Sequence, residues 1–331
     1  MAVTLADVAR AAEVSTSTVS RALTQPERVD ERTRARILDT ARRLGYRPNR
    51  AARSLITGRT GNLGVIVPDL TNPFFPDVVA GIQARAHQRA LTTLLADTGD
   101  DPDAERDLIA TLAPQVDGLV LCGARLPVDD LADAVSGSAV VLVNRSEPGL
   151  ASVAVDNAGG ARQAVEHLHA LGHRRIGLVA GPATSHSARE RSDGARRAAA
   201  ALGVDLVEVG TVAPTFDGGR GVADAVLRAD VSAVVAYNDA ITIGLLHRLH
   251  GYGVRIPAEL SVVGFDDIQI AQMAHPPLTT VRFPRREAGR LAVDRLLDLL
   301  AGERDPGDEP EPLPTELVVR ASTAVHRSRT T

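Results

Sequence analysis

One stretch near the N-terminus combines small hydroxyl side chains with a single guanidinium group, which suits the reading of DNA bases. Residues 14–23 read VSTSTVSRAL, and Val19, Ala22 and Leu23 recur at helical spacing to define an apolar face. The hydroxyl groups on such a helix can donate and accept hydrogen bonds, and their small size lets the backbone approach the floor of a groove. Arg21 follows one turn later, where its forked guanidinium can pair with guanine. The alternative is a solvated polar face of a helix.

Two further helical patterns flank this stretch. Residues 4–12 (TLADVARAA) begin with Thr4 as a helix N-cap, and Asp7 three residues later makes a variant of the capping box. Ser15 is predicted to be the N-cap of the second helix, and a third helical pattern covers residues 31–44. Three short helices with a tight turn between the first two are typical of a helix-turn-helix unit.

Charge is distributed unevenly along the chain. The 331 residues carry a net charge of −4, but residues 1–60 contain 12 Arg against six Asp and Glu, so they carry +6 and the remainder carries −10. A basic head indicates binding to a polyanion, because neutralising phosphates supplies most of the non-specific affinity for nucleic acids. Glu13 occupies the turn between the first two helices, so we expect it to point away from phosphate or to pair with an arginine. If this residue has a positive φ, its Cβ costs about 1 kcal/mol.

The rest of the chain has a different pattern, in which short apolar runs alternate with helical stretches. The apolar runs are residues 63–69, 91–97, 118–123, 139–144, 175–181, 232–239 and 260–267. Strands that are apolar throughout and alternate with helices predict a parallel sheet covered on both faces. The pattern occurs twice, at about 63–156 and 157–282, which predicts two similar α/β lobes. A final helix (286–301) and a terminal strand (315–321) follow.

Polar residues follow several of these predicted strands. They are Asp69, Asn144, the pair Asn238–Asp239 and the pair Asp266–Asp267. Ligands of such sheets bind beyond the carboxyl ends of the strands, and carboxylates and amides suit a ligand that carries hydroxyl groups. We expect Asp239 to cap the helix that follows it. Asp69 could serve either as a ligand-binding group or as a cap.

The composition excludes several classes of protein. Cys122 is the only cysteine, which rules out an internal disulfide framework, suits a reducing cytoplasm and favours a buried apolar role. No apolar run approaches the ~18 residues of a membrane helix, and the N-terminus lacks a signal-peptide pattern. His167 and His169 are two positions apart, so they do not share a helix face. His173 lies in the same stretch, HLHALGH, at the end of the predicted helix. We therefore expect no metal site here. No dinucleotide-binding, Walker A or G-x-S-x-G motif is present, so we expect no cofactor and no enzymatic activity.

Several longer motifs together resemble one family. They are VTLADVARAAEVSTSTVSRAL, LGYRPNRAARSL, LGVIVPDLTNPFF, HLHALGHRRIGLVAG, VVGFDD and PLTTVRFP. In this order they are similar to the lactose-repressor (LacI/GalR) family of bacterial transcription regulators, and the similarity covers nearly the whole chain. The resemblance implies a three-helix DNA-reading head, a hinge helix, and a core like the periplasmic sugar-binding proteins with two Rossmann-like parallel-sheet lobes.

The resemblance also implies where the domains begin and end. The head would be residues 1–46, the hinge helix and linker 47–60, the core 61–325 and the tail 326–331. Within the core, the N-lobe would take about 61–156 and 285–312, and the C-lobe about 157–284 and 313–325. Three crossovers would join the lobes near residues 156, 284 and 313. Family members work as homodimers on near-palindromic operators, so a homodimer and double-stranded operator DNA are the expected partners.

The family pattern assigns roles to individual residues of the head and hinge. The residues expected at DNA are Thr4, Leu5, Ser15, Thr16, Ser17, Thr18, Ser20, Arg21, Asn49, Arg50, Ala52 and Leu55. Thr16, Ser17 and Arg21 match base-reading positions, whereas Thr18 and Ser20 would support phosphate contact or packing. In the hinge, Leu55 matches a leucine that inserts between base pairs in the minor groove and bends the duplex. Ala52 would lie on the groove floor, with Asn49 and Arg50 on the DNA backbone.

A second set of residues matches the effector site of the family. These residues are Asp69, Phe74, Phe75, Asn144, Arg191, Phe216, Asn238 and Asp266. A few polar groups between aromatic walls suit a small polar ligand, and a sugar is the commonest effector of the family. The sequence therefore predicts a DNA-binding transcriptional repressor controlled by a small-molecule effector. The alternative is a cytoplasmic α/β ligand-binding protein or an enzyme with no role at DNA.

Overall fold

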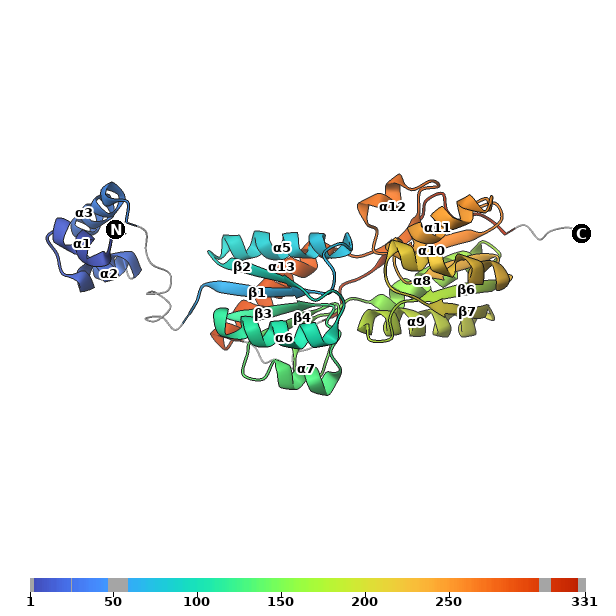
Figure 1. Cartoon of the computed structure of the whole chain (residues 1–331), viewed down its shortest axis with the longest axis horizontal. Coiled ribbons are helices and arrows are strands. Elements are labelled where there is room, and N and C mark those ends of the chain that lie inside the picture. The colour runs from blue at the N-terminus through green and yellow to red at the C-terminus, as the bar shows by residue number, and fades with distance from the viewer. Residues whose placement is uncertain (1–2, 25, 47–58, 304–310, 327–331) are drawn as a thin grey trace, which may run out of the picture. The chain divides into compact units, whose positions relative to one another are not determined.

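The computed structural model describes residues 3–24, 26–46, 59–303 and 311–326. The chain divides into two compact units, Met1–Gly61 and Asn62–Thr331. The first is helical and the second is α/β with two separate sheets, so the predicted fold class is confirmed (Figure 1). None of the helices within these described ranges is long and apolar enough to cross a membrane.

Three helices and a 3-10 turn build the first unit. They are α1 (Leu5–Ala11), α2 (Thr16–Thr24), η1 (Pro26–Arg28) and α3 (Glu31–Leu44). Their small core contains Val8, Val19 and Ile37, each fully buried, so the three helices pack on one another through short aliphatic side chains. Gly45 ends α3 in the left-handed conformation, where glycine has no steric penalty.

The first sheet of the second unit is parallel throughout, in the order β2-β1-β3-β4-β5. Its strands are β1 (Asn62–Val67), β2 (Thr92–Asp97), β3 (Gly118–Cys122), β4 (Val140–Val143) and β5 (Ala151–Val153). The helices α5 (Phe74–Gln88) and α13 (Arg285–Ala301) cover one face, and α6 (Pro102–Leu112) and α7 (Val128–Ala134) cover the other (Figure 1). We call this sheet with its helices the N-lobe. β3 and β4 are buried along their whole length, as expected for strands covered on both faces.

The second sheet has the order β11-β10-β9-β8-β6-β7 and, with its helices, forms the C-lobe. Its strands are β6 (Arg175–Ala180), β7 (Asp205–Thr211), β8 (Ala233–Ala236), β9 (Ser261–Phe265), β10 (Thr279–Arg282) and β11 (Glu316–Val318). Its helices are α8 (Asn157–Ala170), α9 (His186–Leu202), α10 (Phe216–Arg228), α11 (Asp239–Gly251) and α12 (Gln269–Met273). β11 is shorter than the predicted strand 315–321, and it pairs with β10 in the antiparallel direction.

Within the described residues, the chain passes between the two lobes at three places. It leaves β5 for α8, leaves β10 for α13, and returns to β11 after residue 311. Two of these segments lie side by side, because Val155 and Leu313 form a parallel bridge. The carboxyl ends of the strands in both lobes face the same interlobe region, where the predicted polar residues lie.

Candidate DNA-reading head and effector pocket

The helix α2 presents hydroxyl groups on its exposed side, as the sequence predicts. Thr16, Ser17 and Arg21 are exposed, whereas Val19 and Ala22 are buried against the other two helices. The i, i+4 spacing of Ser17 and Arg21 puts both on one side of the helix. A helix of this kind can lie close to base edges because no bulky side chain intervenes. Thr18 and Ser20 are half-buried at the edge of this face.

The N-terminus of α2 is held by a cluster of hydroxyl groups. Ser15 Oγ accepts a hydrogen bond from the backbone N of Thr18 at 3.1 Å, so the predicted capping role is confirmed. The same oxygen lies 2.8 Å from Ser17 Oγ and 2.7 Å from Thr18 Oγ1. These contacts orient the hydroxyl groups before any ligand arrives, which reduces the entropy lost on binding.

The helix α1 and the turn after it also follow the sequence closely. Thr4 Oγ1 accepts from Asp7 N at 3.3 Å and Asp7 Oδ2 accepts from Thr4 N at 2.9 Å, which completes the predicted capping box. Leu5 is half-buried and packs on the core of the head. Glu13 has φ of 52°, the left-handed region that disfavours a Cβ. It is exposed and forms no ion pair with an arginine among the described residues.

Four of the residues predicted at DNA lie outside the described residues. They are Asn49, Arg50, Ala52 and Leu55. Their roles remain those that the family resemblance implies.

A cavity lies between the lobes, at the carboxyl ends of both sheets. It is lined by seven of the eight residues predicted at the effector: Asp69, Phe74, Phe75, Asn144, Arg191, Asn238 and Asp266. The first four belong to the N-lobe and the other three to the C-lobe, so a ligand here would touch both lobes. The cavity measures about 20 Å³, room for one or two water molecules. A sugar ring is larger, so its entry requires the lobes or the lining side chains to move.

The predicted residue Phe216 does not line this cavity. It is the first residue of α10, it is 41% exposed, and its ring lies 5.5 Å from that of His247. Phe216 instead lines an adjacent groove together with Pro214 and Ile270. Its ring is tilted by 50° against that of His247, which lies on the neighbouring α11.

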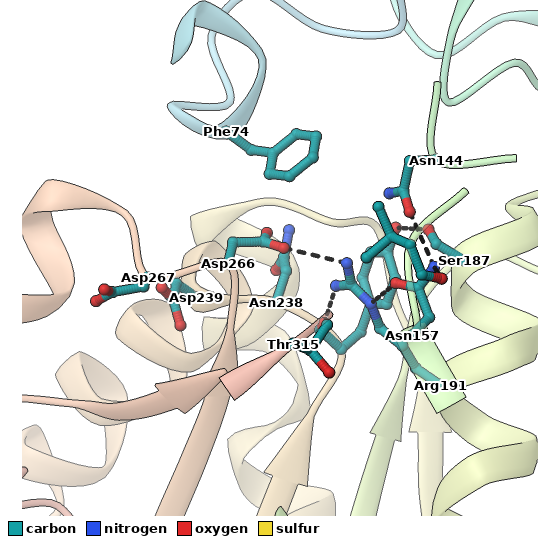
Figure 2. A network of polar contacts seen from close by, with 12 residues as sticks. Phe74, Asn144, Asn157, Ser187, Arg191, Asn238, Asp239, Asp266, Asp267 and Thr315 are labelled. Atoms are coloured by element: carbon teal, nitrogen blue, oxygen red, sulfur yellow. Dashed lines mark hydrogen bonds and ion pairs between the residues drawn. The ribbon is translucent and has the colours of Figure 1, made fainter. Parts of the chain in front are cut away.

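Arg191 occupies the centre of the C-lobe wall (Figure 2). Its Nη2 lies 3.2 Å from Asp266 Oδ1, its Nη1 donates to the carbonyl of Tyr237 at 2.7 Å, and its guanidinium lies 3.6 Å from the ring centroid of Phe265. Arg191 and Asp266 are 5% and 4% exposed, so the ion pair is nearly free of solvent. Burial raises the pKa of the Asp266 carboxyl, although Arg191 and Arg285 oppose that rise. Asp266 also has φ of 109°, a conformation that non-glycine residues rarely adopt and that often marks a functional position.

Asn157 connects Arg191 to the N-lobe (Figure 2). Its Oδ1 accepts from Arg191 Nε at 2.9 Å, and its Nδ2 donates to Asn144 Oδ1 at 2.9 Å. Asn144 follows β4 and has φ of 59°. A chain of polar contacts therefore runs from Asn144 through Asn157 and Arg191 to Asp266.

The expectation that Asp239 caps α11 is wrong. Asn238 is the N-cap, since its Oδ1 accepts from Ile241 N at 2.9 Å, and its Nδ2 donates to the carbonyl of Pro214 at 3.2 Å. The carboxylate of Asp239 instead accepts from Ile268 N at 2.9 Å and from Thr280 Oγ1 at 2.6 Å. It is fully buried, and burial and the nearby charge of Asp266 hold its pKa well above the usual range. Asp239 therefore stabilises the loop that carries Asp266, through its hydrogen bond to the backbone N of Ile268.

The N-lobe wall of the cavity has an apolar part, formed by Phe74 and Phe75, and a polar part that includes Asp69. Phe74 and Phe75 are buried and their rings meet edge to face, with centroids 4.9 Å apart. Phe74 also lies 5.6 Å from the ring of Phe283. Asp69 is half-buried, and its Oδ1 accepts from the backbone N of Thr71 at 2.7 Å. It stabilises the loop before α5 without capping that helix, whose N-cap is Pro73.

Sequence reasoning missed several residues of this cavity, namely Asn72, Asp100, Arg125, Ser187 and Tyr237. Arg125 is buried. Its Nε donates to Asp100 Oδ1 at 2.6 Å, and its Nη1 donates to the carbonyl of Gly123 at 2.8 Å. Its place just beyond β3 was a usable signal, because strand ends line such sites. Tyr237 and Ser187 share a hydrogen bond of 3.0 Å between their hydroxyl groups, which no local pattern predicts.

His173 serves the structure of the C-lobe. His173 Nδ1 lies 2.9 Å from Ser232 Oγ and its Nε2 lies 3.1 Å from Ser261 Oγ. Burial lowers the pKa of His173 to about 4, so this ring is neutral at physiological pH. Cys122 is buried too, and burial raises the pKa of its thiol to about 12.

A helix-turn-helix head joined to a two-lobed core with an interlobe pocket defines a ligand-responsive DNA-binding regulator. Comparisons with known proteins identify the family. Residues 4–49 match "Bacterial regulatory proteins, lacI family" and residues 165–323 match "Periplasmic binding protein-like domain". The chain is 35% identical to the HTH-type transcriptional repressor CytR of Escherichia coli (strain K12), over 97% of this chain and 96% of that protein. The chain therefore belongs to the LacI family of transcriptional regulators.

Solved structures agree with this assignment. The Lac repressor dimer bound to operator and the anti-inducer ONPF has a TM-score of 0.89 and 30% identity, covering 98% of this chain and 100% of that one. A complex of the transcriptional regulator CelR with cellobiose has a TM-score of 0.70 and 32% identity, covering 97% and 99%.

Proposed function

We propose that this chain is a repressor whose affinity for operator DNA is set by a small polar effector, a sugar, bound between the lobes. One observation carries the proposal: a buried Arg191–Asp266 pair lies in a cavity shared by two lobes of a LacI-family core. A guanidinium and a carboxylate side by side can bind neighbouring hydroxyl groups of a sugar, one as donor and the other as acceptor. The rings of Phe74 and Phe75 offer an apolar wall for a sugar face. The cellobiose complex of CelR supports this choice of ligand class.

At DNA, we propose that two copies of the chain bind the two halves of a near-palindromic operator. The dimer bound to operator in the Lac repressor structure supports this arrangement. Thr16, Ser17 and Arg21 would read base edges, and Leu55 of each hinge would enter the minor groove. Residues 1–46, 47–60, 61–325 and 326–331 would form the head, hinge, core and tail. A regulator that binds chromosomal DNA would act in the cytoplasm of a bacterium.

The coupling between effector and operator follows from the shape of the core. Because the cavity admits one or two waters, a sugar that enters it must change the arrangement of the lobes or of the lining side chains. A ligand that favours one arrangement shifts the population towards it. The same free-energy coupling makes operator DNA change the affinity for the effector.

Two experiments test this function. Selection of binding sequences from random duplex DNA should return an inverted repeat, and Arg21→Ala should relax the preference at one base pair of each half-site. A thermal-shift screen of sugars, including cellobiose, and of nucleobases should raise the melting temperature of the core for one ligand class. Failure to enrich any inverted repeat would contradict the role at DNA, and stabilisation by nucleobases alone would contradict the sugar.

A further inference from the structure

Asn157 lies where the chain first crosses between the lobes, and it contacts groups of both. It is the first residue of α8, two residues after Val155, and it is 1% exposed. We infer that Asn157 is a positioning residue that joins Arg191 of the C-lobe to Asn144 of the N-lobe and thereby sets the angle between the lobes. The inference rests on the proposed function only in taking Arg191 as part of the effector site.

The contacts of Asn157 fix the orientation of its amide. Arg191 Nε can only donate, so the group facing it at 2.9 Å must be the carbonyl oxygen of the amide. The amide nitrogen then faces Asn144 Oδ1 at 2.9 Å and Glu190 Oε2 at 2.9 Å. Its two N–H groups match these two acceptors, and the carbonyl of Val155 lies farther away at 3.4 Å. Aspartate could accept from Arg191 but could not donate, and an aliphatic residue could do neither, so the site requires an amide.

Both neighbours of Asn157 are themselves held in place. Arg191 donates to the carbonyl of Tyr237 and stacks on Phe265, so its Nε has one direction. The backbone N of Asn144 donates to the carbonyl of Val153 at 3.0 Å, and its φ of 59° restricts the loop after β4. A rotation of one lobe against the other must therefore stretch or break the bond between Asn157 and Asn144. A ligand that displaces the Arg191 guanidinium would act on the same bond through Oδ1 of Asn157.

The test measures the angle between the lobes directly, in the full-length protein without effector or DNA. Nitroxide labels are attached through Asp107→Cys on α6 and Arg197→Cys on α9, both exposed positions. Cys122 does not interfere, because its thiol is buried and has a pKa of about 12. Labelled chains are diluted with unlabelled protein so that distances within one chain dominate the pulsed electron-electron resonance signal.

Asn157→Ala and Asn144→Ala should each shift or broaden the interlobe distance distribution. One lost hydrogen bond of about 1 kcal/mol changes the ratio of two lobe arrangements by about fivefold. The double variant should shift the distribution no further than Asn157→Ala alone, because Asn157→Ala already removes the only bond that Asn144→Ala removes. Arg191→Lys, which lacks the Nε donor, should produce part of the same shift. The control is Arg162→Ala on the same helix, whose exposed guanidinium pairs with Glu166 one turn away, and it should match the parent.

The inference is overturned if Asn157→Ala and Asn144→Ala leave the distribution like that of the parent, or if their effects add in the double variant. Asn144→Ala leaves Asn157 and its bonds to Arg191 and Glu190 intact. It therefore tests the hydrogen bond between Asn157 and Asn144 even if Asn157→Ala does not fold. Neither result depends on DNA or effector, so a failure here leaves the proposed function standing. Equally, failure of the DNA selection or of the thermal-shift screen would leave the inferred role of the Asn157–Asn144 hydrogen bond standing.

Discussion

Glu105 is a buried carboxylate that holds the loop beneath the N-lobe wall of the cavity. It lies on α6, it is 2% exposed, and a single oxygen, Oε2, accepts from the backbone N of Arg125 at 2.7 Å and of Leu126 at 3.0 Å. The loop so fixed carries Arg125 and Gly123, which line the cavity. Glu105→Ala should therefore destabilise the core, because it leaves two buried N–H groups without an acceptor.

The size of this effect follows from the two bonds. Each buried N–H group left without an acceptor lowers the free energy of unfolding by about 1–3 kcal/mol. Removing the carboxylate offsets part of this loss, because burying a charged group is itself unfavourable. We therefore expect the free energy of unfolding to fall by about 3 kcal/mol in all. For a core of this size, each kcal/mol lost from the free energy of unfolding lowers the melting temperature by about 2–4 °C. The melting temperature of Glu105→Ala should therefore fall by roughly 9 °C. Differential scanning calorimetry on the full chain measures this fall.

Two matched variants separate this effect from a general loss of charge. Glu105→Gln keeps an oxygen that can accept both N–H groups, so its midpoint should stay close to the parent. Asp103→Ala, on the same helix, removes only the exposed partner of Arg106 and should change the free energy of unfolding by less than about 1 kcal/mol. A midpoint for Glu105→Ala within about 2 °C of the parent would refute the reasoning, since about 1 kcal/mol or less would then be lost.

The pH dependence of Glu105 gives a second readout. Burial raises the pKa of its carboxyl above the ordinary value of 4.5, despite its two backbone hydrogen bonds. The folded state therefore binds the proton more tightly than the unfolded state, and stability is lost as the pH rises through the raised pKa. Glu105→Gln cannot titrate, so the stability of this variant relative to that of the parent should increase as the pH rises from about 4.5. A relative stability that decreases over that range would contradict the burial of this carboxyl.

Three further predictions concern the proposed sites. Arg21→Ala should lower discrimination at one base pair by about 1–3 kcal/mol, measured by fluorescence anisotropy on operators substituted at each position; unchanged discrimination at every position would remove Arg21 from base reading. Leu55→Ala should reduce the bend of the operator in a circular-permutation gel assay, and a bend equal to that of the parent would refute the wedge. Asp266→Ala should weaken the effector found by thermal shift about 10-fold or more in titration calorimetry, the loss of a charge-assisted hydrogen bond. An unchanged affinity would place Asp266 outside the site.

Local chemistry made the head predictable. Thr4, Asp7 and Ser15 cap helices through residues three positions away, so their roles can be read from the sequence alone. The left-handed φ of Glu13 follows from its place in a tight turn. Most strands of the core were predictable from their continuous apolar runs, whereas β5, β7 and β10 have no such run and were missed.

Contacts between distant segments were not predictable in this way. Asp239 reads as a cap because it begins a helix, but its partners Ile268 and Thr280 are 29 and 41 positions away. Phe216 reads as a pocket aromatic, but its ring lies against that of His247, which is 31 positions away on α11. Asn157 carries no local signal of its role, because Asn144 and Arg191 reach it from two different lobes.

The central claim is that a ligand in the interlobe cavity controls binding to the operator. The most direct test is the operator Kd, measured by fluorescence anisotropy with and without the effector, for the parent and for Arg191→Ala. We predict that the effector changes the operator Kd of the parent by about 5–150-fold, and that Arg191→Ala loses this response while it still binds operator. An operator Kd that stays the same at saturating effector in the parent would contradict the account.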